Sequence, residues 1–119
     1  MANPNIVNVA TINGNTNVAN VTTNATAIVT NTNASGKIYK INMIVVSNVD
    51  TTNSATLTVD LYRGNVAYQM ISNIAVSINT AYTPIDKTLC LYLLEGDSIR
   101  LTANANSRLQ AICSWEEIS

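Results

Sequence analysis

The sequence predicts an all-β fold: a single antiparallel β-sandwich of seven or eight strands, jelly-roll or immunoglobulin-like, with an extended N-terminal arm. Three observations predict it. Several segments alternate apolar and polar residues with the two-residue period of a half-buried strand. Thr, which suits a pleated surface, and Asn, which favours turns, occur 15 and 18 times in 119 residues. Short turn sequences separate the alternating segments, a spacing typical of sandwiches and small barrels.

The N-terminal part differs from the rest in charge. Residues 1–35 carry no charged side chain, and all thirteen charges fall between Lys37 and Glu117. We predict that residues 1–24 form an Asn- and Thr-rich arm and that residues 25–119 form the sandwich. The arm has too many apolar residues for a disordered tail, so we expect it to dock on this domain or on a neighbour. Ordinary strands are the alternative for this segment. The predicted partner-contacting residues are Ile6, Val7, Val9, Ile12, Val18 and Val21.

The first half of the sandwich is predicted as three strands. Thr26–Thr30 is the first, and a turn follows over residues 33–36. Residues 37–49 form a long strand, and residues 55–62 alternate clearly, with Thr56, Thr58 and Asp60 directed outward. Gly64 and Asn65 then supply the positive φ of a tight hairpin. On the long strand, one face is expected to hold Tyr39, Ile41, Met43 and Val45.

The second half continues the same pattern. Strands are expected over residues 66–71, 74–78, 89–94 and 99–103, with a final strand from Leu109. Pro84 marks an edge strand or a corner, because proline cannot donate to a central ladder. The inward residues of the last strand are expected to be Leu109, Ala111, Cys113 and Trp115.

The composition argues against several function classes. The chain has no histidine, so a Ser-His-Asp or Cys-His arrangement cannot exist within it, and we expect no enzyme. No cofactor or metal site is expected, because Cys90 and Cys113 are isolated from other soft ligands. Both cysteines are expected to be buried; a disulfide between them is an alternative if their strands adjoin. Six basic residues and a net charge of −1 do not favour nucleic-acid binding, and no apolar run reaches membrane-spanning length.

Carbohydrate binding is the main alternative to a structural role. Sugar-binding sandwiches pair an exposed aromatic ring with amide and carboxylate groups. Tyr62 shares the outward parity of Thr58 and Asp60, so it is the candidate exposed aromatic residue. A single surface tyrosine is more often a packing or interface residue than a sugar platform.

Three segments resemble the small virion structural proteins of tailed bacteriophages, especially those of marine and cyanobacterial hosts. They are the opening IVNVATING (residues 6–14), the stretch LEGDSIRLTANAN (residues 94–106) and the ending SWEEIS (residues 114–119). The resemblance implies a capsid decoration (cement) protein, or else a tail, neck or fibre component. It implies the major capsid protein as partner, a homo-oligomer, most plausibly a trimer, and a place on the capsid surface after assembly in the host cytoplasm. It implies no catalytic or ligand-binding residue.

Overall fold

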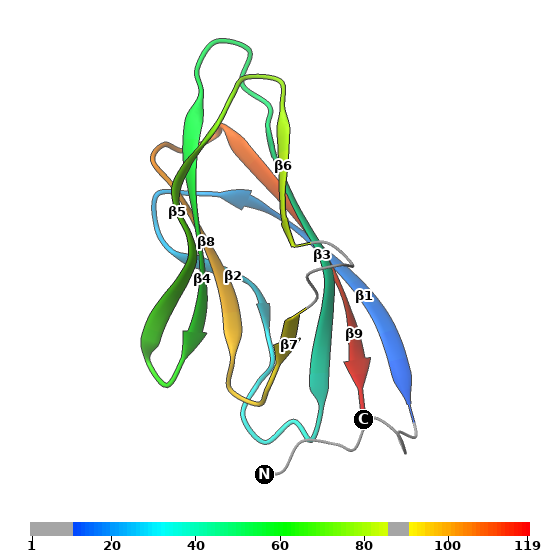
Figure 1. Ribbon diagram of the computed structural model, residues 1–119. Helices are drawn as coiled ribbons and strands as arrows, with labels where there is room; N and C mark the ends of the chain where they lie inside the picture. The colour runs from blue at the N-terminus through cyan, green and yellow to red at the C-terminus, as the bar shows by residue number, and fades with distance from the viewer. Residues whose placement is uncertain (1–10, 86–90) are drawn as a thin grey trace.

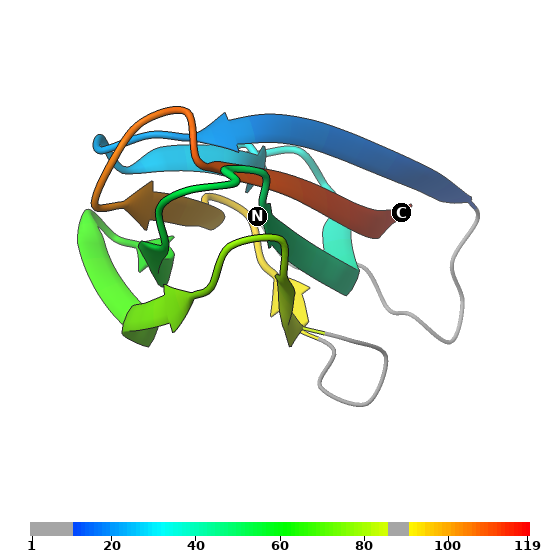
Figure 2. The same ribbon diagram turned by 90° about the horizontal axis from the view of Figure 1, so that it is seen from above.

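The computed structural model describes residues 11–85 and 91–119, which form two antiparallel sheets packed face to face. Sheet A has the order β1-β9-β3-β6, with β7 also paired to β3, and sheet B has the order β2-β8-β4-β5. The layers are visible in Figures 1 and 2. The strands are β1 (Ile12–Val21), β2 (Thr26–Thr30), β3 (Ile38–Asn48), β4 (Ala55–Arg63), β5 (Val66–Val76), β6 (Ala81–Ile85), β7 (Leu91–Leu93), β8 (Ser98–Ala103) and β9 (Leu109–Ile118).

The predicted all-β sandwich is confirmed, and the connections favour the jelly roll of the two topologies expected. The chain crosses between the sheets from β1 to β2, from β2 to β3 and from β3 to β4, then from β5 to β6, and again from β7 to β8 and from β8 to β9. Such repeated crossing is typical of a double-sheet jelly roll. The described residues form nine strands rather than seven or eight, and no helix, so none of them forms a helical membrane span.

Residues 12–21 correct the predicted boundary between arm and sandwich. They form β1, which pairs with β9 without a register shift from Ile12↔Ile118 to Val21↔Leu109. The alternative reading of this segment as a strand of the domain therefore holds for residues 12–21. Asn is depleted in strands in general, and its uncharged polar side chain is accommodated here because β1 is an edge strand that is exposed along most of its length. Residues 1–10, the rest of the predicted arm, lie outside the described residues.

A bulge in β3 changes which residues face the core. The register with β9 shifts between Ile41 and Met43, so that Asn42 is the extra residue. Ile41 lies inward before the bulge, and Ile44 and Val46 lie inward after it, all with no exposed surface. The single face predicted for Tyr39, Ile41, Met43 and Val45 is therefore wrong beyond Ile41. A bulge reverses the face to which every later residue of the strand points. The alternation of residue types along the sequence does not show where this reversal occurs.

The remaining predicted strands match with small changes. Residues 66–71 and 74–78 merge into the single strand β5, which has register shifts opposite Val59. Pro84 lies in β6, an edge strand of sheet A, as predicted. The core fills the space between the sheets, and Ala55, Leu57, Val59, Leu109, Ala111 and Cys113 belong to it as expected.

A buried amide fixes the loop that follows β2. Asn31 has no exposed surface, and its Nδ2 donates hydrogen bonds to the carbonyls of Lys37 (2.9 Å) and Leu93 (3.0 Å). Its Oδ1 accepts a hydrogen bond from Ser35 Oγ at 2.6 Å. Because a buried polar group costs free energy unless it is paired, these bonds hold the loop against β7.

Candidate interaction surface

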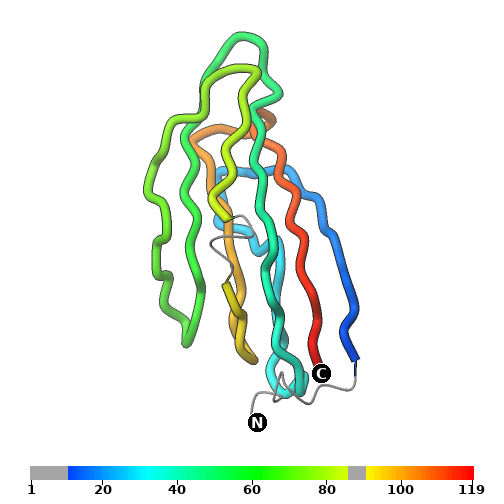
Figure 3. The backbone as a smooth tube through the Cα atoms, turned by 45° about the vertical axis from the view of Figure 1, so that its right-hand side comes forward, coloured from blue at the N-terminus to red at the C-terminus, as the bar shows by residue number. Residues whose placement is uncertain are grey.

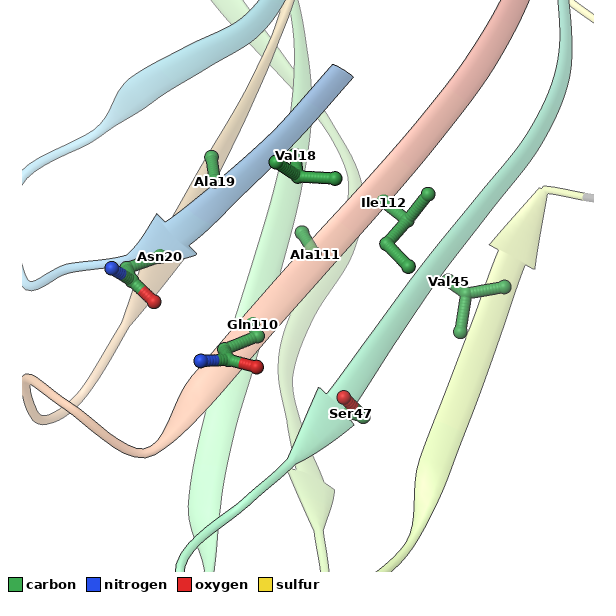
Figure 4. Close-up of a pocket in the computed structure, with 8 residues that line it drawn as sticks. All are labelled: Val18, Ala19, Asn20, Val45, Ser47, Gln110, Ala111 and Ile112. Atoms are coloured by element: carbon green, nitrogen blue, oxygen red, sulfur yellow. The ribbon is translucent and has the colours of Figure 1, made fainter. Parts of the chain in front are cut away.

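The outer face of sheet A carries an apolar row across three strands. Val18 of β1 is opposite Ile112 of β9, which in turn is opposite Val45 of β3. Val18 is 67% exposed and Ile112 is 43% exposed, while Val45 is partly buried. Figure 4 shows the three side chains in line across the sheet. They line an open hollow of about 340 Å³ together with Ala19, Asn20, Ser47, Gln110 and Ala111.

The rows on either side of the apolar row are uncharged, and all of their side chains but Met43 are polar. One consists of Asn20, Gln110 and Ser47, and the other of Thr16, Ser114 and Met43. Over these three rows the outer face of sheet A has no charged side chain. Burial of this face against another protein therefore desolvates amides and hydroxyls and requires no unpaired charge to be buried.

The residues predicted to contact a partner are only partly brought together. Val18 lies in the apolar row, and Ile12 is 56% exposed near the start of β1. Val21 is 2% exposed and belongs to the core instead, because the register of β1 directs it inward opposite Leu109. Ile6, Val7 and Val9 lie outside the described residues. Ile112 was missed, although an isoleucine at an outward position of an alternating strand was a visible signal.

Tyr62 is not the open aromatic surface that the sequence predicted. The guanidinium of Arg100 lies 4.0 Å from the centre of its ring and covers one face of it. Arg100 is held there by Asp60, whose Oδ1 accepts a hydrogen bond from Arg100 Nε at 2.9 Å. Asp60 is 4% exposed, which corrects its predicted solvent-facing role. Tyr68 is more exposed than Tyr62, at 56%.

A polar hollow of about 350 Å³ lies at one end of the sandwich, beside Tyr62. Arg63 Nε donates to Asp97 Oδ1 at 2.8 Å, and the backbone N–H of Leu94 donates to Asp97 Oδ2 at 2.9 Å. Glu95 Oε2 accepts from the backbone N–H of Gly36 at 2.7 Å, whereas its buried Oε1 has no hydrogen-bond partner within the described residues.

The described residues offer little for covalent or metal chemistry. Burial raises the pKa of the Cys113 thiol to about 12, so the thiol stays protonated at neutral pH. Cys90 lies outside the described residues, and its pairing with Cys113 stays an open alternative. In residues 11–85 and 91–119, no three His, Cys, Asp or Glu side chains gather in a group that could hold a metal ion.

The sequence matches no protein-family model and no curated protein. A solved structure is similar in fold, with a TM-score of 0.55 and 14% sequence identity. The alignment covers 92% of this chain and 87% of the other chain. That structure is described by the words "Bacillus endospore appendages form a novel family of disulfide-linked pili". At this level of identity the similarity supports the fold, and it extends over nearly the whole sandwich.

Proposed function

We propose that this protein is a non-enzymatic structural subunit of a larger assembly and that it contacts its neighbours through the outer face of sheet A. The observation that carries the proposal is the row of Val18, Ile112 and Val45, in which Val18 and Ile112 are exposed, between uncharged and mostly polar rows. A contiguous apolar surface with a polar, uncharged rim is typical of a protein–protein contact.

The fold similarity supports the same class of role. The similar solved chain belongs to an appendage described as a pilus, which is a repeating assembly of subunits. A low-charge surface also suits repeated packing, because little electrostatic repulsion separates identical copies.

Decoration of a bacteriophage shell is the more specific form of this proposal. It follows from the sequence resemblance to virion structural proteins, with the major capsid protein as the partner. Many modest contacts of this kind would stabilise a shell through multivalency. A tail, neck or fibre component would use the same surface with fewer copies per particle.

Quantitative mass spectrometry of purified particles tests this form directly. A copy number equal to that of the major shell protein, or a fixed large fraction of it, is expected for decoration. A few copies per particle would instead indicate the neck, tail or fibre. Absence from particles would contradict the virion proposal.

A pair of substitutions tests the surface itself. Ile112→Lys places a charge in the apolar row and should reduce incorporation into the assembly at least tenfold. Thr102→Lys is the matched control, because Thr102 is partly exposed on β8 of sheet B. Equal incorporation of both variants and the unchanged protein would contradict the assignment of this face.

Carbohydrate binding is a second candidate, favoured by the polar hollow beside Tyr62. Glu95 and the amide groups of Asn33 and Asn65 line this hollow beside Tyr62, and sugar-binding sites combine carboxylate and amide groups with an aromatic ring. Saturable, sugar-specific binding on a glycan array, lost in Glu95→Ala, would establish it. Binding to no glycan would remove this candidate and leave the structural role.

A further inference from the structure

We propose that two copies of this chain associate through their β1 strands, which pair antiparallel about a two-fold axis and join the two A sheets into one continuous sheet. This inference rests on the proposed structural function and specifies how its subunits associate. The occupant of the free edge of β1 is therefore a second copy of the same strand.

The four sheet edges differ in how well they are protected. β6 contains Pro84 and has five residues, and β2 has five residues and a register shift. β5 is longer but has two register shifts in its pairing with β4. Prolines, short lengths and bulges are the features that prevent edge-to-edge pairing. β1 has none of them: it has ten residues, no charge and an unbroken register with β9.

The hydrogen bonds of β1 identify its free groups. Thr11 and Ser119 exchange both backbone hydrogen bonds, at 3.0 and 2.9 Å. Because the register is regular, hydrogen-bonded and non-bonded pairs alternate along the strand. The backbone N–H and C=O groups that point away from β9 therefore belong to residues 12, 14, 16, 18 and 20. Within residues 11–85 and 91–119 this row of five donors and five acceptors has no hydrogen-bond partner, and it can pair with the same row of a second copy.

The side chains favour one register of this pairing. If Val18 lies opposite Val18 of the second copy, the row of Val45, Ile112 and Val18 continues directly into the partner's row. The continuous apolar strip across the two-fold axis would bury Val18, which is 67% exposed and is the most exposed of these three side chains. The absence of charge in β1 means that the two-fold axis brings no like charges together.

The position of β1 in the fold leaves this edge accessible. β1 and β5 lie at opposite margins of the molecule in Figures 1 and 3. Nine of the ten residues of β1 are exposed or partly exposed, and only Val21 is buried. A second copy can therefore approach β1 without displacing the other described strands. The pairing uses one edge in both copies and so produces a closed dimer rather than an open chain.

The first test is sedimentation velocity on the full-length chain over a range of concentrations. The expected result is a reversible monomer–dimer equilibrium. Thr16→Pro removes one free N–H of β1 without removing a hydrogen bond to β9, because residue 16 points away from β9. It should weaken dimerisation at least tenfold, whereas the control Thr16→Ser should not. Circular dichroism and a melting curve establish that both variants are folded.

A second measurement does not depend on how well the proline is tolerated. In Val18→Cys, a short bis-maleimide reagent should join two copies across the two-fold axis, and the unchanged protein controls for the native cysteines. Asn53→Cys, in an exposed loop, is the matched control and should not cross-link efficiently.

The outcomes separate the inference from the function on which it rests. A monomer at all concentrations that still enters particles or filaments would overturn the β1 pairing and leave the structural role intact. A dimer unaffected by Thr16→Pro, or a trimer, would also overturn the pairing, since another surface would then join the copies. A protein that neither self-associates nor enters an assembly would overturn both proposals.

Discussion

The side chain of Asn17 in β1 donates a hydrogen bond from Nδ2 to the backbone carbonyl of Ile28 in β2, at 2.8 Å. The bond joins sheet A to sheet B at the side of the sandwich where β1 and β2 are the edge strands. Ile28 lies within the register shift between β2 and β8. A side chain of the edge strand β1 therefore stabilises the register shift in the edge strand β2.

Asn17→Ala should lower the free energy of unfolding by about 1 kcal/mol, because it removes this hydrogen bond at a partly buried site. Asn20→Ala is the control, since Asn20 is exposed in the same strand and its side chain makes no comparable bond to the rest of the described residues. Urea denaturation monitored by Trp115 fluorescence measures both. Equal effects of the two substitutions would show that the link between the sheets contributes little.

Gly96→Ala should destabilise the fold more than Gly64→Ala. Both glycines have positive φ, +88° and +59°, so either alanine incurs backbone strain of about 1 kcal/mol. At Gly96 the new Cβ would also lie 2.6 Å from Asn33 Oδ1, whereas nothing lies within 4 Å of it at Gly64. Thermal melting of the two variants compares them. The additional loss of stability caused by Gly96→Ala should largely disappear in the double variant Gly96→Ala/Asn33→Ala.

Asp50 should make the fold less stable in acid. The backbone N–H groups of Thr52 and Asn53 donate to its carboxylate and lower its pKa from the ordinary value of 3.8. A lowered pKa in the folded state stabilises the fold above 3.8, and this contribution is lost as the pH falls through the folded-state pKa. A carboxyl NMR titration measures the pKa directly. Asp50→Asn should remove this part of the acid sensitivity; an unshifted pKa would contradict the prediction.

Cys113 should resist alkylation until the protein unfolds. Its thiol has no exposed surface, and burial raises its pKa from 9.0 to about 12. As the pH rises, the Cys113 thiol therefore ionises in the unfolded state before it ionises in the folded state, and the fold loses stability above pH 9. Mass spectrometry of the peptide that contains Cys113, after iodoacetamide treatment with and without urea, provides the measurement. Rapid labelling of the folded protein would show that this part of the core opens readily.

Sequence reasoning found most of the strands because their local patterns are strong. Thr26–Thr30 is found with the same bounds in β2, and the alternation from Ala55 to Val59 correctly assigns the core side of β4. Asp60 was predicted to be exposed because alternation assigns a residue to one face of the sheet. Alternation does not show which other side chains cover that face. The cover is Arg100, which is forty residues away in the chain and lies opposite Asp60 in the register of β4 and β8.

The candidate surface was only half visible in the sequence. Val18 was named as a contact residue because it is an apolar residue in an uncharged segment. Its neighbours Ile112 and Val45 could not be grouped with it, since they are 94 and 27 positions away and meet it only through the order β1-β9-β3. The bulge at Asn42 also reversed the face expected for Val45.

The sequence by itself determined that this protein is a β-sandwich with a low-charge surface, because alternation, turn residues and composition act locally along the chain. Only the tertiary structure decided that residues 12–21 are an edge strand of the sandwich, which outward residues lie side by side, and which edge has free backbone groups. These properties depend on the pairing of distant strands, and pairing is set by the register and bulges of the whole sheet.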